Sequence, residues 1–243
     1  MSLNESNRWR LSSFIEQSFR NQADRDYISA RLLFKAELYQ NFLWPSLQAV
    51  EKYLKAIFLF NYVPVKRFDH KVAPMLDEVK GLPSLESVIP EHVDKFVRHL
   101  GTYGPDRYLS HQFSLTNTDL QDLDWSVWHI RRYCQDFLLM PDDEKLKPEK
   151  LDRVPFERQH RQALNADPGK PALFRISGLL ERVLAEGPAP MQEALMWNNS
   201  CLSSSETDIP PHAILMIENP VHIISPELIT ILEGLVKLPK EAC

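Results

Sequence analysis

Apolar residues recur with the 3.6-residue period of an α-helix over most of the first 140 residues of the chain. The clearest run steps by three or four through Leu120, Leu123, Val127, Ile130, Cys134 and Phe137. This spacing places all of them on one stripe of a helix, and we expect that helix to begin near Asn117 or Thr118 as its cap. No run of alternating apolar and polar residues, which would predict a strand, competes in this part of the sequence.

The same period predicts further helices over about 24–39, 43–61 and 85–103, and a short one over 72–80. Pro45 is compatible with its helix only if it lies in the first turn, and Gly81 is expected to close the short helix. Long amphipathic helices with short connections bury their stripes most simply against each other. We therefore expect an all-α fold, an antiparallel bundle of four to five helices, with a mostly helical C-terminal extension.

Proline divides the chain: of 18 prolines, six lie in residues 1–140 and twelve in the shorter remainder. We expect a bundle over 1–140, a linker over 141–171 and a small extension over 172–243, with helices near 172–186, 190–200 and 225–238. The apolar stretch Ala213–Glu218 predicts either a buried strand or a short helix, because periodicity does not distinguish them at this length.

Charge and composition narrow the classes of site. The net charge is -5, and the acidic excess lies wholly after residue 140, so a polyanion site is expected in the first part. Only seven glycines are present, which argues against a Gly-rich nucleotide loop, and three distant cysteines argue against a Cys-x-x-Cys metal site. No metal or cofactor is predicted. No secretory signal or membrane-spanning stretch is evident, so we expect a cytoplasmic protein without membrane association.

Two stretches carry a family resemblance: D-R-D-Y-I-S-A-R at Asp24–Arg31 and S-L-Q-A-V-E-K-Y-L-K-A-I-F-L at Ser46–Leu59, followed by His70 at the head of the next helix. They resemble the HEPN domain family over roughly residues 9–140. The resemblance implies a helical bundle that usually dimerises. It also implies membership of a family that includes toxins, partners of nucleotidyltransferases and chaperone-like proteins.

Ribonuclease members of that family carry an arginine, four to six intervening residues and a histidine. Arg107 and His111 lie where this pair is expected, but only three residues intervene, and Arg107-Tyr108 is more similar to the Arg-Tyr-Pro-like turn of non-nuclease relatives. Metal-free RNA cleavage needs a base for the 2′-hydroxyl proton and a cation for the phosphorane. Arg107 and His111 are therefore the candidate catalytic pair. The competing interpretation is an arginine in a turn and a histidine in a loop or helix cap.

Basic side chains of the first part form the candidate binding surface for a nucleotide or RNA. With one aromatic neighbour, they are Lys52, Lys55, Lys66, Arg67, His70, Lys71, Arg98, Arg107 and Tyr108. The competing interpretation is a solvated helix face with intrahelical ion pairs and a soluble loop.

Three hypotheses follow: a non-catalytic nucleotide- or RNA-binding module, a metal-independent ribonuclease using Arg107 and His111, and a structural protein that acts through dimerisation. Tyr27, Phe34 and Leu38 lie off the apolar stripe of their helix. This surplus either completes the core or meets a second copy, and it predicts a two-fold homodimer. A nucleotidyltransferase is the partner protein that the resemblance implies.

Overall fold

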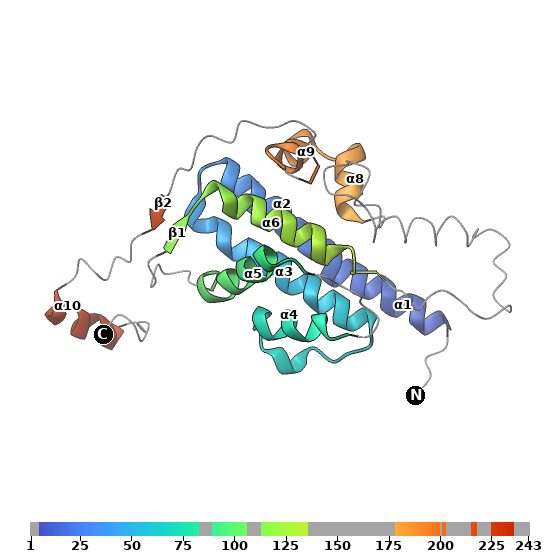
Figure 1. The fold of residues 1–243 in the computed structure, drawn as a ribbon, viewed down its shortest axis with the longest axis horizontal. Helices are drawn as coiled ribbons and strands as arrows, with labels where there is room; N and C mark the ends of the chain where they lie inside the picture. The colour runs from blue at the N-terminus through green and yellow to red at the C-terminus, as the bar shows by residue number, and fades with distance from the viewer. Residues whose placement is uncertain are drawn as a thin grey trace.

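The computed structural model describes residues 5–82, 89–105, 113–135, 178–199, 201–202, 215–217 and 225–235. Its first part contains α1 (Glu5–Ile15), η1 (Glu16–Arg20), α2 (Asn21–Lys35), α3 (Tyr39–Phe60), η2 (Lys66–Phe68), α4 (Val72–Lys80), α5 (Glu91–Tyr103), β1 (Phe113–Leu115) and α6 (Asn117–Arg131). Its second part contains α8 (Leu179–Glu186), α9 (Ala189–Met196), β2 (Leu215–Ile217) and α10 (Pro226–Leu235). The fold is an all-α bundle, as predicted (Figure 1).

The first long helix runs continuously from Glu5 to Lys35, because one turn of π-helix, η1, joins α1 to α2. The predicted start near Asp24 was therefore wrong. A π turn inserts one residue into the helical period, which interrupts the apolar stripe that marks a helix in the sequence.

Helix α3 is the central element and contacts α1, α2, α4, α5 and α6. It begins at Tyr39, so Pro45 lies inside the helix and not in its first turn as expected. Pro45 has no N–H to donate to the carbonyl of Asn41. The burial of the α3 apolar residues against these five neighbouring helices compensates for this missing bond.

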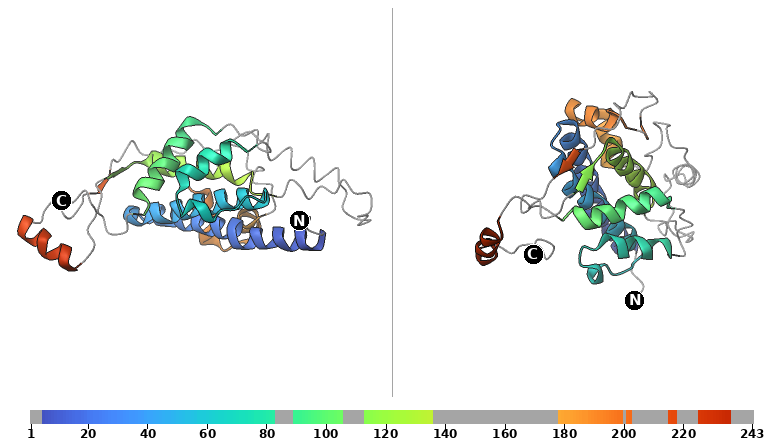
Figure 2. Two further views of the ribbon diagram at one scale, coloured as in Figure 1. Left: turned by 90° about the horizontal axis from the view of Figure 1, so that it is seen from below. Right: turned by 60° about the vertical axis from the view of Figure 1, so that its left-hand side comes forward.

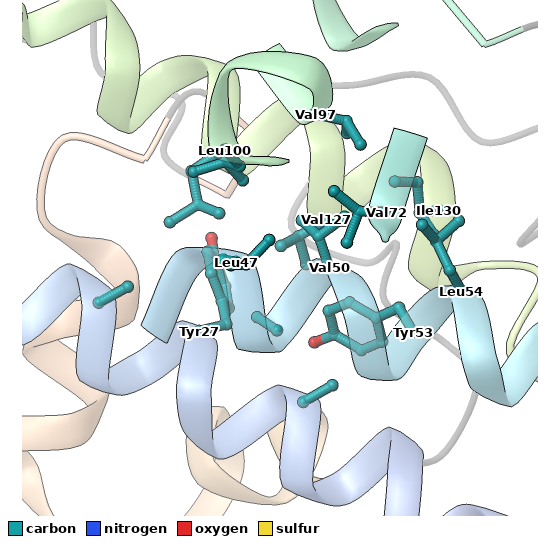
Figure 3. Packing of buried hydrophobic residues seen from close by; sticks show 14 of the residues in the cluster. Tyr27, Leu47, Val50, Tyr53, Leu54, Val72, Val97, Leu100, Val127 and Ile130 are labelled. Carbon is teal, nitrogen blue, oxygen red and sulfur yellow. The ribbon is translucent and has the colours of Figure 1, made fainter. Parts of the chain in front are cut away.

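Apolar side chains from α2, α3, α4, α5 and α6 converge in one core, of which Figure 3 shows Tyr27, Leu47, Val50, Leu54 and Val127 among others. The predicted core residues Leu54, Phe96 and Val127 are buried, whereas Phe137 lies outside the described residues. Of the surplus apolar residues, Tyr27 and Phe34 complete this core and Leu38 remains 53% exposed.

The boundaries of α4, α5 and α6 differ in how well the sequence predicts them. Helix α4 spans the predicted residues and ends at Gly81. Helix α5 begins at Glu91, after Pro90, and not near residue 85; residues 83–88 lie outside the described ranges. Helix α6 is capped by Thr116, one residue before the expected cap, through a reciprocal bond with Asp119.

One short strand pair was not expected in the bundle. Strand β1 pairs antiparallel with β2, with Phe113 opposite Ile217. The apolar stretch 213–218, which allowed strand or helix, thus contributes a strand, and its partner is too short for its alternation to be recognised in the sequence.

Helices α8 and α9 pack against α2, and their side chains Leu180, Val183 and Leu195 join the main core. Residues 178–202 therefore share the core of the bundle, although a long stretch of sequence separates them from α6. Gly187 and Pro188 separate the two helices as predicted. The expected linker, 141–171, lies outside the described residues. Helix α10 stands apart from the bundle in the views of Figures 1 and 2.

Candidate functional site

The C-terminal half of α3 and the turn that follows it gather several of the predicted binding residues. Glu51 is buried at 3% exposure, and its Oε1 accepts hydrogen bonds from Lys55 on the next helical turn and from Nδ1 of His70, 2.7 Å away. We call Glu51, Lys55 and His70 the Glu51 cluster. In the described part of the chain, Oε2 of Glu51 is buried without a hydrogen-bond partner. Most buried polar atoms in proteins have a hydrogen-bond partner, so Oε2 of Glu51 is an exception to the usual pattern.

The chain reverses sharply to bring His70 back to α3. Phe68 is buried and stacks on Phe58 of α3, with ring centroids 4.9 Å apart. Asp69 and His70 then adopt left-handed backbone conformations, with φ of 44° and 64°. Asp and His adopt this region more readily than most residues, but the conformation is still energetically unfavourable for each of them. The turn is thus fixed from both sides, by the Phe68 anchor and by the contact between His70 and Glu51.

The basic turn, residues Lys66–Lys71, presents its charges around the beginning of α4. Lys66 and Lys71 are exposed, and neither has a carboxylate partner among the described residues. Lys71 is also the N-cap of α4, where backbone N–H groups carry the positive end of the helix dipole. Arg67, in contrast, pairs with Glu78 of α4 and lies over the ring of Phe68.

The remaining described cations of the predicted surface are neutralised by acids. Lys52 pairs with Asp26 of α2 and is not part of the Glu51 cluster, whose lysine is Lys55. Arg98 of α5 pairs with Asp94, 2.8 Å away, and with Asp77 of α4. The hydrogen bond from Arg98 is the largest cause that lowers the pKa of Asp94. These residues form surface ion pairs, which leave Lys66, His70 and Lys71 as the part of the predicted surface suited to bind an anion.

Three predicted residues, Arg107, Tyr108 and His111, lie outside the described residues. Their flanks are described: Gly104 ends α5, and β1 begins at Phe113. At Gly104 an added Cβ would lie 2.8 Å from Cβ of Leu47, so the end of α5 approaches α3 too closely for a side chain.

A buried polar network, which the sequence analysis did not predict, holds residues 178–202 against the bundle. Arg131 of α6 makes a two-bond pair with Asp24 of α2, at 2.7 and 3.0 Å, and reaches both carboxylate oxygens of Glu181 at 2.8 Å. Asp24 Oδ2 also accepts the backbone N–H groups of Leu179 and Leu180 at the start of α8. Tyr53 donates to Asp24 Oδ1, and burial together with that carboxylate raises the pKa of Tyr53.

A second buried network lies about two helical turns further along α2, at Arg31. Arg31 pairs with Asp124 of α6, and it donates to the carbonyl oxygens of Ala194 and Trp197 beyond it. Tyr27 donates to the same carboxylate at 2.7 Å and accepts from Asn199 at 2.9 Å. Each of the three nitrogens of the Arg31 guanidinium thus donates to an acceptor, and such pairing is what allows a guanidinium to be buried.

A signal for these networks exists in the sequence. Arg20, Asp24, Tyr27 and Arg31 step by four, three and four, so they occupy the helix face that would otherwise be apolar. Charged residues at core-facing positions indicate buried pairs, because a lone buried charge is too costly.

Aromatic and titratable side chains also cluster between α5 and α6. Trp125 stacks on His129, with ring centroids 5.8 Å apart, and meets His92 edge to face. Burial raises the pKa of Asp122 to about 6, with a further contribution from Asp119. Burial, then Arg132 and His92, lower the pKa of His129 to about 4. Arg132 donates to Nδ1 of His129, so this cluster is occupied by its own contacts, as expected of a half-buried packing region.

The described residues contain neither a metal centre nor a membrane-spanning helix. Within those ranges no three His, Cys, Asp or Glu side chains are grouped closely enough to hold a metal ion. Likewise, none of the described helices combines the length and apolar character needed to cross a membrane.

Residues 17–123 match the model of the HEPN domain. Neither the curated proteins nor the solved structures contain a match to this chain. The matched range covers the π turn through the first half of α6, and it includes the Glu51 cluster and the basic turn.

Proposed function

Residues 17–123 form a HEPN domain, and from this premise we propose that the domain is a non-catalytic module that binds RNA or a nucleotide through its phosphate groups. The binding surface consists of Lys66, His70 and Lys71 in the basic turn, with Arg107 and Tyr108 from the segment after α5 as further contributors. The observation that carries the proposal is the pair of exposed lysines, Lys66 and Lys71, which lack a carboxylate partner in the described ranges.

Physical chemistry supports an anion at this place. Lysine ammonium groups are point charges that bind phosphate oxygens, and the first backbone N–H groups of α4 add a favourable dipole. The anchored turn fixes its backbone before a ligand binds, so binding loses less conformational entropy there than on a free loop. The other described cations of the surface are already paired with acids, which localises the proposed contact.

The experiment measures binding of a labelled single-stranded RNA by fluorescence anisotropy, in EDTA, at several salt concentrations. We expect affinity to fall as salt rises, because phosphate contacts release counterions. Lys66→Ala and Lys71→Ala should each weaken binding by about fivefold to thirtyfold. Lys95→Ala is the matched control, since Lys95 is an exposed lysine that pairs with Glu91. Binding that ignores salt, or that Lys95→Ala weakens equally, would contradict the proposal.

The same samples test the ribonuclease hypothesis. If the RNA is recovered intact after incubation, the module is non-catalytic under these conditions. If it is cleaved in EDTA, and cleavage is lost in His111→Ala, then the Arg107–His111 hypothesis replaces ours. Arg107→Ala should weaken RNA binding without lowering thermal stability, whereas a purely structural turn residue would show the reverse.

Assembly is part of the proposal. We propose that the domain forms a two-fold homodimer and works beside a nucleotidyltransferase, as the family resemblance implies. Leu38, which directly precedes α3, is 53% exposed and Leu32 of α2 is 36% exposed, and these apolar side chains support a contact with a second copy. Light scattering at micromolar concentration tests the dimer, and copurification with the enzyme tests the partner. A monomer mass would contradict the first, and separate elution would contradict the second.

A further inference from the structure

The Glu51 cluster fixes how His70 can form hydrogen bonds. An ionised carboxylate only accepts hydrogen bonds, and Lys55 donates to Oε1 of Glu51 beside the imidazole. Nδ1 of His70, 2.7 Å from the same oxygen, therefore carries a proton. In the neutral ring the other nitrogen, Nε2, is then an acceptor.

Nε2 of His70 is available to a ligand. The His70 side chain is 74% exposed, whereas its carboxylate partner is 4% exposed. In the described part of the chain, no hydrogen bond to Nε2 is found. The exposed nitrogen is thus oriented by a buried group and faces solvent, just as a carboxylate fixes the tautomer and orientation of a metal-ligating imidazole.

The residues around His70 in the turn indicate which group of a ligand the Nε2 acceptor would bind. Lys66 and Lys71 carry only donors, which suit phosphate oxygens, whereas a neutral Nε2 has nothing to offer a phosphate oxygen. The sugar-phosphate backbone contains one group that donates a hydrogen bond, the ribose 2′-hydroxyl, and DNA lacks it. A turn that places an oriented acceptor among phosphate-binding ammonium groups therefore matches the ribose-phosphate unit.

We propose that His70, oriented by Glu51, accepts a hydrogen bond from a ribose 2′-hydroxyl and so makes this surface select ribose-phosphate ligands over their deoxyribose counterparts. The inference depends on the proposed binding function and adds the ligand class to it. Glu51 is a positioning residue in this account, because it acts through the imidazole.

The first experiment compares three labelled single strands of equivalent sequence: RNA, DNA and 2′-O-methyl RNA. We expect the wild type to prefer RNA over both others, because the methylated oxygen no longer donates a hydrogen bond. His70→Ala should lower the RNA affinity by about threefold to tenfold more than the DNA affinity, the worth of one neutral hydrogen bond, because loss of the contact with Glu51 loosens the turn for both strands and only RNA also loses the 2′-hydroxyl bond. His70 is exposed, so this variant should retain the fold.

A second variant separates recognition from charge. His70→Lys supplies a cation but no acceptor, so we expect DNA affinity to be kept or raised and the preference for RNA to be lost. If His70→Lys retains the RNA preference, or if His70→Ala weakens RNA and DNA equally, then His70 contacts a phosphate or a base and the inference is overturned.

Glu51→Leu tests the positioning role. Leucine fills the buried position but removes the acceptor of Nδ1, so the ring proton is no longer held on Nδ1 and Nε2 is no longer a fixed acceptor. We expect a reduced RNA preference, and a thermal melt confirms that the variant is folded. An unchanged RNA preference in the folded variant would contradict the role of Glu51.

Competition by free nucleotides identifies the size of the ligand. If a ribonucleoside triphosphate displaces RNA better than its 2′-deoxy counterpart does, the surface also selects the ribose of a free nucleotide. If the two triphosphates compete equally while the RNA strand is still preferred over DNA, the selectivity requires an RNA strand. If the wild type binds RNA and DNA equally well, the binding function stands and the 2′-hydroxyl inference fails. If it binds neither strand nor nucleotide, both fail.

Discussion

Arg131 on α6 and Asp24 on α2 form a buried two-bond ion pair, although they are 107 positions apart in the sequence. The pair does not stand alone, because Glu181 and the backbone N–H groups of Leu179 and Leu180 complete its hydrogen bonds. Residues 178–202 thereby satisfy charges that the bundle buries. We infer that the bundle and this segment unfold as one cooperative unit.

Arg131→Ala should strongly destabilise the protein, because it leaves Asp24 buried beneath α8 without its cation. We expect a loss of about 3 to 5 kcal/mol in the free energy of unfolding, measured by urea denaturation. Lys95→Ala, which breaks the fully exposed pair with Glu91, is the control and should leave the midpoint unchanged. A small effect of Arg131→Ala would mean that water enters the network and solvates Asp24.

Gly178→Ala tests the close approach of α8 to this network. An added Cβ would lie 2.3 Å from Nη2 of Arg131 and 2.9 Å from Oε2 of Glu181, and both atoms are held by hydrogen bonds. We expect a loss of about 1 to 3 kcal/mol from overpacking. Gly81→Ala is the matched control, since its Cβ would meet only the carbonyl of Glu78 at 3.5 Å. Equal melting temperatures of the two variants would contradict the packing of α8.

Arg31→Lys keeps a positive charge but cannot reproduce the guanidinium fork, which reaches Asp124 and the carbonyl oxygens of Ala194 and Trp197. Each carbonyl left without a donor costs about 1 to 3 kcal/mol. We expect limited proteolysis to cut within 178–202 sooner than in the wild type. Lys35→Ala, which removes the exposed pair with Glu193 at the same interface, should not change the cleavage rate. Unaltered proteolysis of Arg31→Lys would refute the role of the fork.

The sequence predicts those parts of this fold in which helical periodicity is unbroken. It predicts α4 with both of its ends, because the apolar spacing and Gly81 agree. It does not predict the continuation of the first helix through η1, since a π turn shifts the period, nor the interior position of Pro45, since packing of α3 compensates for the missing hydrogen bond.

The candidate site was predicted only in part, for a different reason. The sequence identifies basic residues but does not show which of them form ion pairs. Lys52, Arg67 and Arg98 pair with acidic residues of neighbouring elements, so they are less available to bind an anion. The contact between His70 and Glu51 depends on a reversal of the chain with positive φ at two non-glycine residues. Glycine usually occupies positions with positive φ, and these two positions are not glycines. The sequence therefore contains no local pattern that predicts this reversal.

Leu54→Ala tests the centre of the bundle. Leu54 is fully buried on α3 among the residues shown in Figure 3. Truncation removes apolar contacts and leaves a cavity, so we expect a loss of about 2 to 5 kcal/mol in urea denaturation. Leu38→Ala provides the comparison, because Leu38 is 53% exposed and its truncation should change stability little. A Leu54 variant as stable as the Leu38 variant would refute the placement of α3.

The pH dependence of stability should reflect two groups between α5 and α6. His129 lowers stability as the pH falls, and Asp122 lowers it as the pH rises. The pKa of His129 is lowered to about 4 in the folded protein. As the pH falls from about 6.5 to about 4, the unfolded chain binds a proton that folded His129 does not, so this group reduces stability. The pKa of Asp122 is raised to about 6. As the pH rises from about 4 to about 6, the unfolded chain loses a proton that folded Asp122 retains, so this group also reduces stability.

Asp122→Asn and His129→Gln separate the two effects, because each replaces a titrating group with a neutral side chain of similar shape. Relative to the wild type, we expect Asp122→Asn to gain thermal stability as the pH rises through about 6, and His129→Gln to gain it as the pH falls toward about 4. Both side chains are half-buried, so solvent screening makes the shifts modest and their direction is the test. Melting temperatures of the wild type and the two variants, measured across this pH range, test both directions. Parallel curves would show that neither group changes its proton affinity on folding.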